Sequence, residues 1–100
     1  MKMITKILIQ DDLSIQDNCA IEVDVNLSDG QKRWCWIMTP TALQSCGDWI
    51  DGTKIRFHYG SKHLIIISEK LTEELIHKAL HSIDNNGEII DCTLFVDEDV

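Results

Sequence analysis

The sequence predicts a single α+β domain over residues 1–100, with a mainly antiparallel sheet of five to six strands and one long helix packed on one face. Three observations predict this fold. Residues 19–27 alternate strictly between apolar and polar side chains, which is typical of a strand with one buried face. Residues 54–59 alternate in the same way, and residues 72–83 carry apolar side chains at the helical spacings of three and four.

The first two expected strands are residues 3–10 and 19–27, and the second leads into a hairpin. Asp29-Gly30 is a strong signal for a two-residue hairpin loop. Such a loop would place Trp34 and Trp36 opposite buried valines, so both tryptophans are expected on the core face. The same register would place Cys35 opposite Asp24 on the wetter face.

A short helix and a loop are expected after this hairpin. Thr39 can cap the helix, Pro40 suits its first position, and Gly47 suits its end. Residues 48–52 are then expected to form a loop.

A second hairpin is expected between residues 54–59 and 62–68, around Gly60-Ser61. Its register would place His58 opposite His63 and send Leu64 and Ile66 into the core. Ile65 and Ile67 would then lie on the opposite face of the sheet, together with Ile37.

The long helix is expected from a cap at Thr72 to a stop at Asn85-Asn86-Gly87, with Glu73 and Glu74 favourable in its first turn. Residues 88–96 are rich in β-forming side chains and are expected to form a last strand. This strand would cover the second face of the sheet, or another protein chain would do so.

The charge balance limits the classes of partner. The chain has 17 acidic and 9 basic residues, a formal net charge of -8 and a pI near 4.7. Duplex DNA and anionic membranes both need a basic footprint, so neither is expected as a partner. No apolar run reaches the length of a membrane span and no signal peptide is evident, so we expect a cytoplasmic protein.

No arrangement of residues predicts a reaction or a cofactor. The four cysteines form no CxxC pair and are expected to be reduced thiols. His58 and His63 are weak candidate metal ligands, and His77 and His81 are spaced four apart on the expected helix. Structural zinc takes four ligands, so we expect surface histidines, no bound metal and no enzymatic activity.

A binding surface is the functional feature that the pattern favours. Its expected residues are acidic side chains of one strand and isoleucines of the second sheet face, namely Glu22, Asp24, Ile37, Ile65 and Ile67. The acidic side chains would steer a basic protein to the surface. A first alternative is a homodimeric structural or regulatory domain whose interface contains Ile65 and Ile67. A second alternative is a small metal-binding domain that uses the histidines.

The middle of the chain resembles the small immunity proteins of bacterial polymorphic toxin systems. The resembling segments are Val23-Asp24-Val25 before Asp29-Gly30, residues 34–40 with Leu43, residues 59–67, and the helix over residues 72–83. The resemblance covers roughly residues 20–85 and is a pattern of elements. It implies a non-enzymatic, cytoplasmic, acidic inhibitor that covers the active site of a toxin, and it carries over no contact residue.

Overall fold

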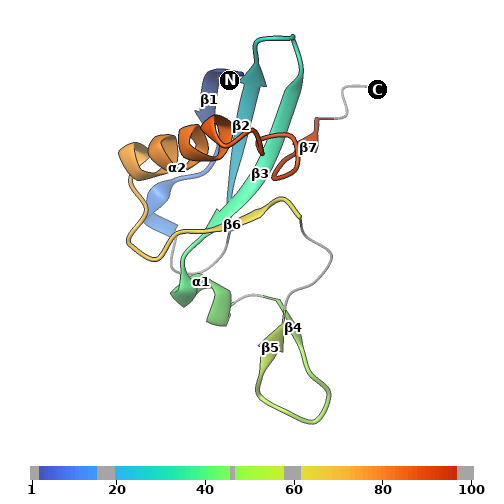
Figure 1. Ribbon diagram of the computed structural model, residues 1–100. Helices are drawn as coiled ribbons and strands as arrows, with labels where there is room; N and C mark the ends of the chain where they lie inside the picture. The colour runs from blue at the N-terminus through green and yellow to red at the C-terminus, as the bar shows by residue number, and fades with distance from the viewer. Residues whose placement is uncertain (1–2, 16–19, 46, 58–61, 97–100) are drawn as a thin grey trace.

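The computed structural model describes residues 3–15, 20–45, 47–57 and 62–96 (Figure 1). The elements in chain order are β1 (Ile4–Ile9), η1 (Leu13–Ile15), β2 (Ile21–Leu27), β3 (Lys32–Met38), α1 (Pro40–Ser45), β4 (Asp48–Trp49), β5 (Arg56–Phe57), β6 (Leu64–Ile66), α2 (Glu73–Asn85) and β7 (Leu94–Phe95).

Within the described residues, five strands form one sheet in the order β1-β2-β3-β6, and β7 also pairs with β3. The β3–β6 pair is parallel and the other pairs are antiparallel. Figure 1 shows α2 lying across β1 and β2. The predicted α+β fold, with a mainly antiparallel sheet and one long helix, is confirmed.

The β2–β3 hairpin has a register one residue away from the predicted one. Val23 faces Cys35, and Asp24 faces Trp34. The loop holds three residues, because the Leu27 N–H donates to the Gln31 carbonyl oxygen at 2.9 Å. A two-residue Asp-Gly loop needs positive φ at both positions, whereas here Gly30 has φ +91° and no described residue other than glycine has a positive φ.

This one-residue difference reverses every side chain of β3. Arg33, Cys35 and Ile37 point into the core, and Trp34 and Trp36 lie half-buried on the other face. The predicted inward tryptophans and the predicted Cys35 on the wetter face are therefore wrong.

The core lies between the sheet and α2. Its buried members are Ile21, Val23, Val25, Leu27, Cys35, Ile37, Leu71, Ile76, Leu80 and Ile89. Ile65 and Ile67 pack against this cluster and Ile37 is fully buried. The prediction that Ile37, Ile65 and Ile67 lie on the second face of the sheet is therefore wrong.

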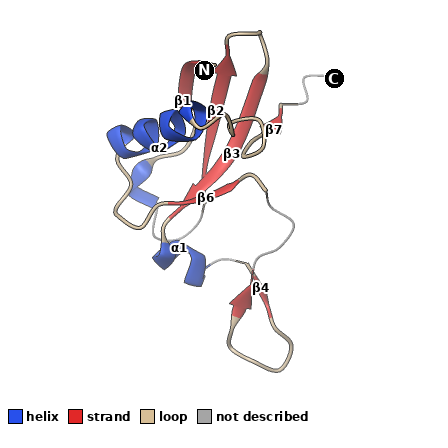
Figure 2. Ribbon diagram, in the orientation of Figure 1, coloured by secondary structure: helices blue, strands red, loops and turns tan. Residues whose placement is uncertain are grey.

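The predicted second hairpin is also wrong in its pairing. β6 pairs in parallel with β3, so that Ile65 lies beside Ile37 and reaches the core. β5 lies within the predicted strand 54–59 but pairs instead with β4, which lies in the predicted loop 48–52. Figure 2 shows this two-stranded hairpin apart from the main sheet. The Gly60-Ser61 turn and His58 lie outside the described residues.

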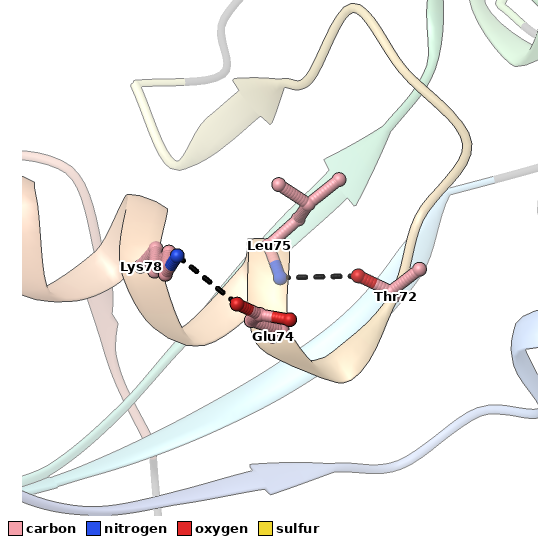
Figure 3. Close-up of polar contacts among 4 residues, drawn as sticks. All are labelled: Thr72, Glu74, Leu75 and Lys78. Atoms are coloured by element: carbon pink, nitrogen blue, oxygen red, sulfur yellow. Dashed lines mark hydrogen bonds and ion pairs between the residues drawn. The ribbon is translucent and has the colours of Figure 1, made fainter.

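Helix α2 begins and ends as predicted. The Leu75 N–H donates to Oγ1 of Thr72 at 3.1 Å, and Lys78 forms an exposed ion pair with Glu74 at 3.0 Å (Figure 3). Ile76 and Leu80 are buried in the core, and Gly87 follows the helix with φ +75°. The short helix α1 is capped as predicted, because the Ala42 N–H donates to Oγ1 of Thr39.

The last described segment is only partly a strand. The pairing of β7 with β3 covers Leu94 and Phe95, whereas residues 89–92 form turns and Ile89 is buried in the core. Arg33 holds this segment in place: its guanidinium donates to Oγ1 and the carbonyl oxygen of Thr93 and to the carbonyl oxygen of Ile90.

Candidate functional site

The face of the sheet that points away from the core carries the candidate site. We call it the outer face. Its apolar, aromatic and acidic members follow from the strand registers: Leu8, Glu22, Asp24, Trp34, Trp36, Leu64 and Ile66, with His63 beside Trp34. Lys6, Asn26 and Lys32 lie at one end of the same face. Among the apolar, aromatic and acidic members, Leu8 is 39% and Ile66 46% exposed, and the others are half-buried. Apolar, aromatic and acidic side chains thus share one accessible surface.

The centre of the outer face is aromatic. The rings of Trp34 and Trp36 lie 5.2 Å apart between centroids, edge to face at 87°. The ring of His63 lies 4.7 Å from that of Trp34. β3 positions both tryptophans because they are two residues apart on one strand, and β6 follows directly after His63.

Two carboxylates of β2 lie next to these rings. Asp24 faces Trp34 and Glu22 faces Trp36 across the β2–β3 pair. Burial, followed by the charges of Asp24 and Asp11, raises the pKa of Glu22. The carboxylates therefore lie in a partly desolvated and electrostatically crowded place, where a positive charge would be favourable.

The two carboxylate oxygens of Asp24 differ in their hydrogen bonding. Its Oδ2 accepts a hydrogen bond from Nε2 of Gln10 at 2.6 Å. Its Oδ1 is buried and has no hydrogen-bond partner among the described residues. A buried carboxylate oxygen without a donor is costly, and an incoming donor would remove that cost.

The surroundings of His63 favour its neutral form. Burial, followed by the charge of Lys62, lowers its pKa, and its Nδ1 is buried without a hydrogen-bond partner among the described residues. In the described part of the chain, no group of three or more His, Cys, Asp or Glu side chains could hold a metal ion. His58, the other weak candidate ligand, lies outside the described residues.

The described cysteines are free thiols with weak nucleophilic character. Burial, followed by the charges of Cys92 and Asp24, raises the pKa of Cys35 to about 12. Burial also raises the pKa of Cys92, with further contributions from Glu88 and Asp91. Both thiols are therefore protonated near neutral pH and are poor nucleophiles. Cys19 and Cys46 lie outside the described residues.

The structure brings together only part of the predicted binding surface. Glu22 and Asp24 lie on the outer face, whereas Ile37, Ile65 and Ile67 belong to the core side. Sequence reasoning missed Trp34, Trp36 and His63 as surface residues. The signal that could have found them is the alternation of polar and apolar residues in β2. Once the length of the β2–β3 loop is known, this alternation also shows which side chains of β3 face the solvent.

Comparisons with protein-family models, curated proteins and solved structures find nothing that matches this chain. The similarity to immunity proteins therefore remains a prediction. Among the described residues, no helix has both the length and the apolar character needed to cross a membrane.

Proposed function

We propose that this protein is a small acidic protein-binding domain, most concretely an immunity-type inhibitor, whose outer face docks a basic partner. The observation that carries the proposal is the unpartnered Oδ1 of Asp24 next to Trp34. An arginine of the partner would stack on the tryptophan ring and, once the side chains that cover the Asp24 carboxylate shift aside, donate to this oxygen. Cation–π contact contributes about 0.5–2 kcal/mol, and a charged hydrogen bond about 1.5–3 kcal/mol.

The chain itself contains an arginine–tryptophan contact of the kind that the proposal requires. The guanidinium of Arg56 lies 3.9 Å above the ring of Trp49. The net charge of -8 also favours steered association with a basic protein. Apolar side chains of the outer face, such as Leu8 opposite Asp24 and Leu64 beside Trp36, would exclude water from the contact.

A titration with a blocked arginine-rich peptide tests this surface. The Asp24→Asn variant should bind the peptide about tenfold more weakly than the parent, because the charge-assisted hydrogen bond is lost. Glu73→Gln, which removes one exposed charge from α2, is the matched control and should change the affinity less than about twofold. Equal weakening by both variants would show that net charge alone attracts the peptide, and would contradict the proposal.

The immunity-type function is tested in cells by co-expression with a toxic basic protein encoded beside the gene. The parent chain should restore growth, and Asp24→Lys should abolish the rescue while the variant stays folded. Full protection by Asp24→Lys would place the inhibitory contact elsewhere on the molecule. Absence of protection by the parent would contradict the immunity-type function.

A further inference from the structure

The edge of β1 that lies away from β2, together with the neighbouring side of α2, forms a second surface, distinct from the outer face. β1 is the terminal strand of the sheet and, among the described residues, pairs only with β2. Beside it lies a cleft of about 270 Å³ lined by Ile4, Thr5, Lys6, Ile7, His77 and His81. The first four residues come from β1 and the two histidines from α2.

The register shows which main-chain groups of β1 point away from β2, to the open edge of the strand. The Gln10 N–H donates to the Glu22 carbonyl oxygen at 3.0 Å, and Leu8 faces Asp24. Hydrogen bonding alternates along an antiparallel pair, so Leu8 directs its main-chain groups to β2, whereas Ile7 and Ile9 direct theirs to the open edge. Such unpaired groups are a template for another extended strand.

The spacing between β1 and α2 is fixed by Asp84. This helix residue is fully buried, and its Oδ2 accepts hydrogen bonds from the N–H groups of Met3 at 2.7 Å and Ile4 at 2.9 Å. The clamp joins the last turns of α2 to the first residues of β1. The cleft therefore exists before any ligand arrives, which lowers the entropic cost of binding.

The cleft differs in charge from the rest of the molecule. The ionisable side chains that α2 directs to it are those of His77 and His81, and no carboxylate is among the lining residues, in a chain that carries 17 acidic residues. Lys6 lines the cleft from β1, but the register turns its side chain to the outer face, together with Leu8. The rings of His77 and His81 lie 6.4 Å apart, and Nδ1 of His81 is buried with no hydrogen-bond partner among the described residues. This chemistry favours a carboxylate in the cleft.

We infer that the cleft binds an extended segment of a partner protein, which adds as a strand to the edge of β1 and directs an acidic side chain toward His77 and His81. Main-chain hydrogen bonds to Ile7 and Ile9 would provide affinity, and the carboxylate would provide selectivity. The cleft volume suits one or two side chains of such a segment. The inference does not depend on the proposed function of the outer face.

The probe is a short blocked peptide of alternating threonine and valine with a central glutamate, titrated into the ¹⁵N-labelled protein. The amide signals of Ile7 and Ile9 should shift. A peptide N-methylated at the amides that face β1 should bind about tenfold more weakly, because it loses main-chain donors. Equal binding of the methylated peptide, shifts confined to β3 and β6, or no shift at millimolar concentration would overturn the inference.

A second experiment tests the selectivity for a carboxylate. The parent should prefer the glutamate peptide over a lysine peptide of the same frame. The His77→Gln/His81→Gln variant should lose this preference and keep its sensitivity to N-methylation, because both half-buried side chains remain polar and the strand edge is unchanged. An unchanged preference in this variant would refute the role of the histidines.

Discussion

Arg33→Met should lower the free energy of unfolding by about 2–4 kcal/mol, because one buried and one half-buried carbonyl acceptor lose their donor. Arg33 is 5% exposed, and its guanidinium donates to the carbonyl oxygens of Thr93 at 2.8 Å and Ile90 at 3.1 Å. It also donates to Oγ1 of Thr93 at 2.7 Å and to Oε1 of Gln31 at 2.9 Å. Methionine fills a similar length of side chain, and relief from burying a charge offsets part of the loss.

Thermal and urea unfolding would measure this change, with an expected fall in Tm on the order of 10–20 °C for a domain of this size. Arg56→Met is the matched control. Arg56 lies over the ring of Trp49, but it is only half-buried, and within the described residues its guanidinium donates to the Gly47 carbonyl oxygen. Its loss should cost under about 1 kcal/mol. Equal costs for the two variants would refute the assignment of Arg33 as the residue that fastens residues 89–95 to β3.

Three further predictions follow from burial and titration. Ile67→Asp should destabilise the protein by about 2–4 kcal/mol, because Ile67 packs against the core. Ile66→Asp, at a 46% exposed position, should cost under about 1 kcal/mol. Similar costs for the two variants would contradict the faces assigned to these residues. Alkylation under denaturing, non-reducing conditions should add a label to each of the four cysteines. Alkylation of the native protein near pH 8 should spare Cys35, because burial raises the pKa of its thiol to about 12. Early labelling of Cys35 in the native protein would disagree with its burial. Folding raises the pKa of Glu22 above its ordinary value of 4.5, so its contribution to stability is present below that pH and is lost as the pH rises through the folded pKa. Glu22→Gln should therefore be more stable than the parent at pH 7, and the difference in unfolding free energy should shrink at about pH 4. Urea unfolding of both proteins at the two pH values measures this difference. A difference that stays constant between the two pH values would contradict the prediction.

Local signals were sufficient for the elements whose partners are near in the chain. The Thr72 cap, the apolar spacing of α2 and the alternation of β2 depend on interactions over a few residues, and the structure has all three as predicted. The acidic side chains of the candidate site, Glu22 and Asp24, were found in the same way. Their place on a solvent face follows from the alternation alone.

The face of β3 depended on the length of one loop, which the local sequence left undecided. Asp-Gly suits a two-residue loop, but a three-residue loop needs only one glycine with positive φ, and it lets Arg33 reach residues 90 and 93. That contact joins residues about sixty positions apart. Patterns among neighbouring residues could therefore not predict this contact. For the same reason they could not predict that Trp34 and Trp36 are partly exposed.

The sequence by itself determined the α+β class, the long helix, the β2–β3 hairpin and the acidic character of the surface, because each rests on composition or on short-range periodicity. The tertiary structure decided that β6 pairs with β3 in parallel, that Ile65 and Ile67 reach the core, and that Asp84 ties α2 to β1. Strand pairing over long distances depends on which register buries the most apolar surface while satisfying groups such as Arg33 and Asp84. That balance is a property of the whole molecule, so only the folded chain places the aromatic outer face and the cleft beside β1.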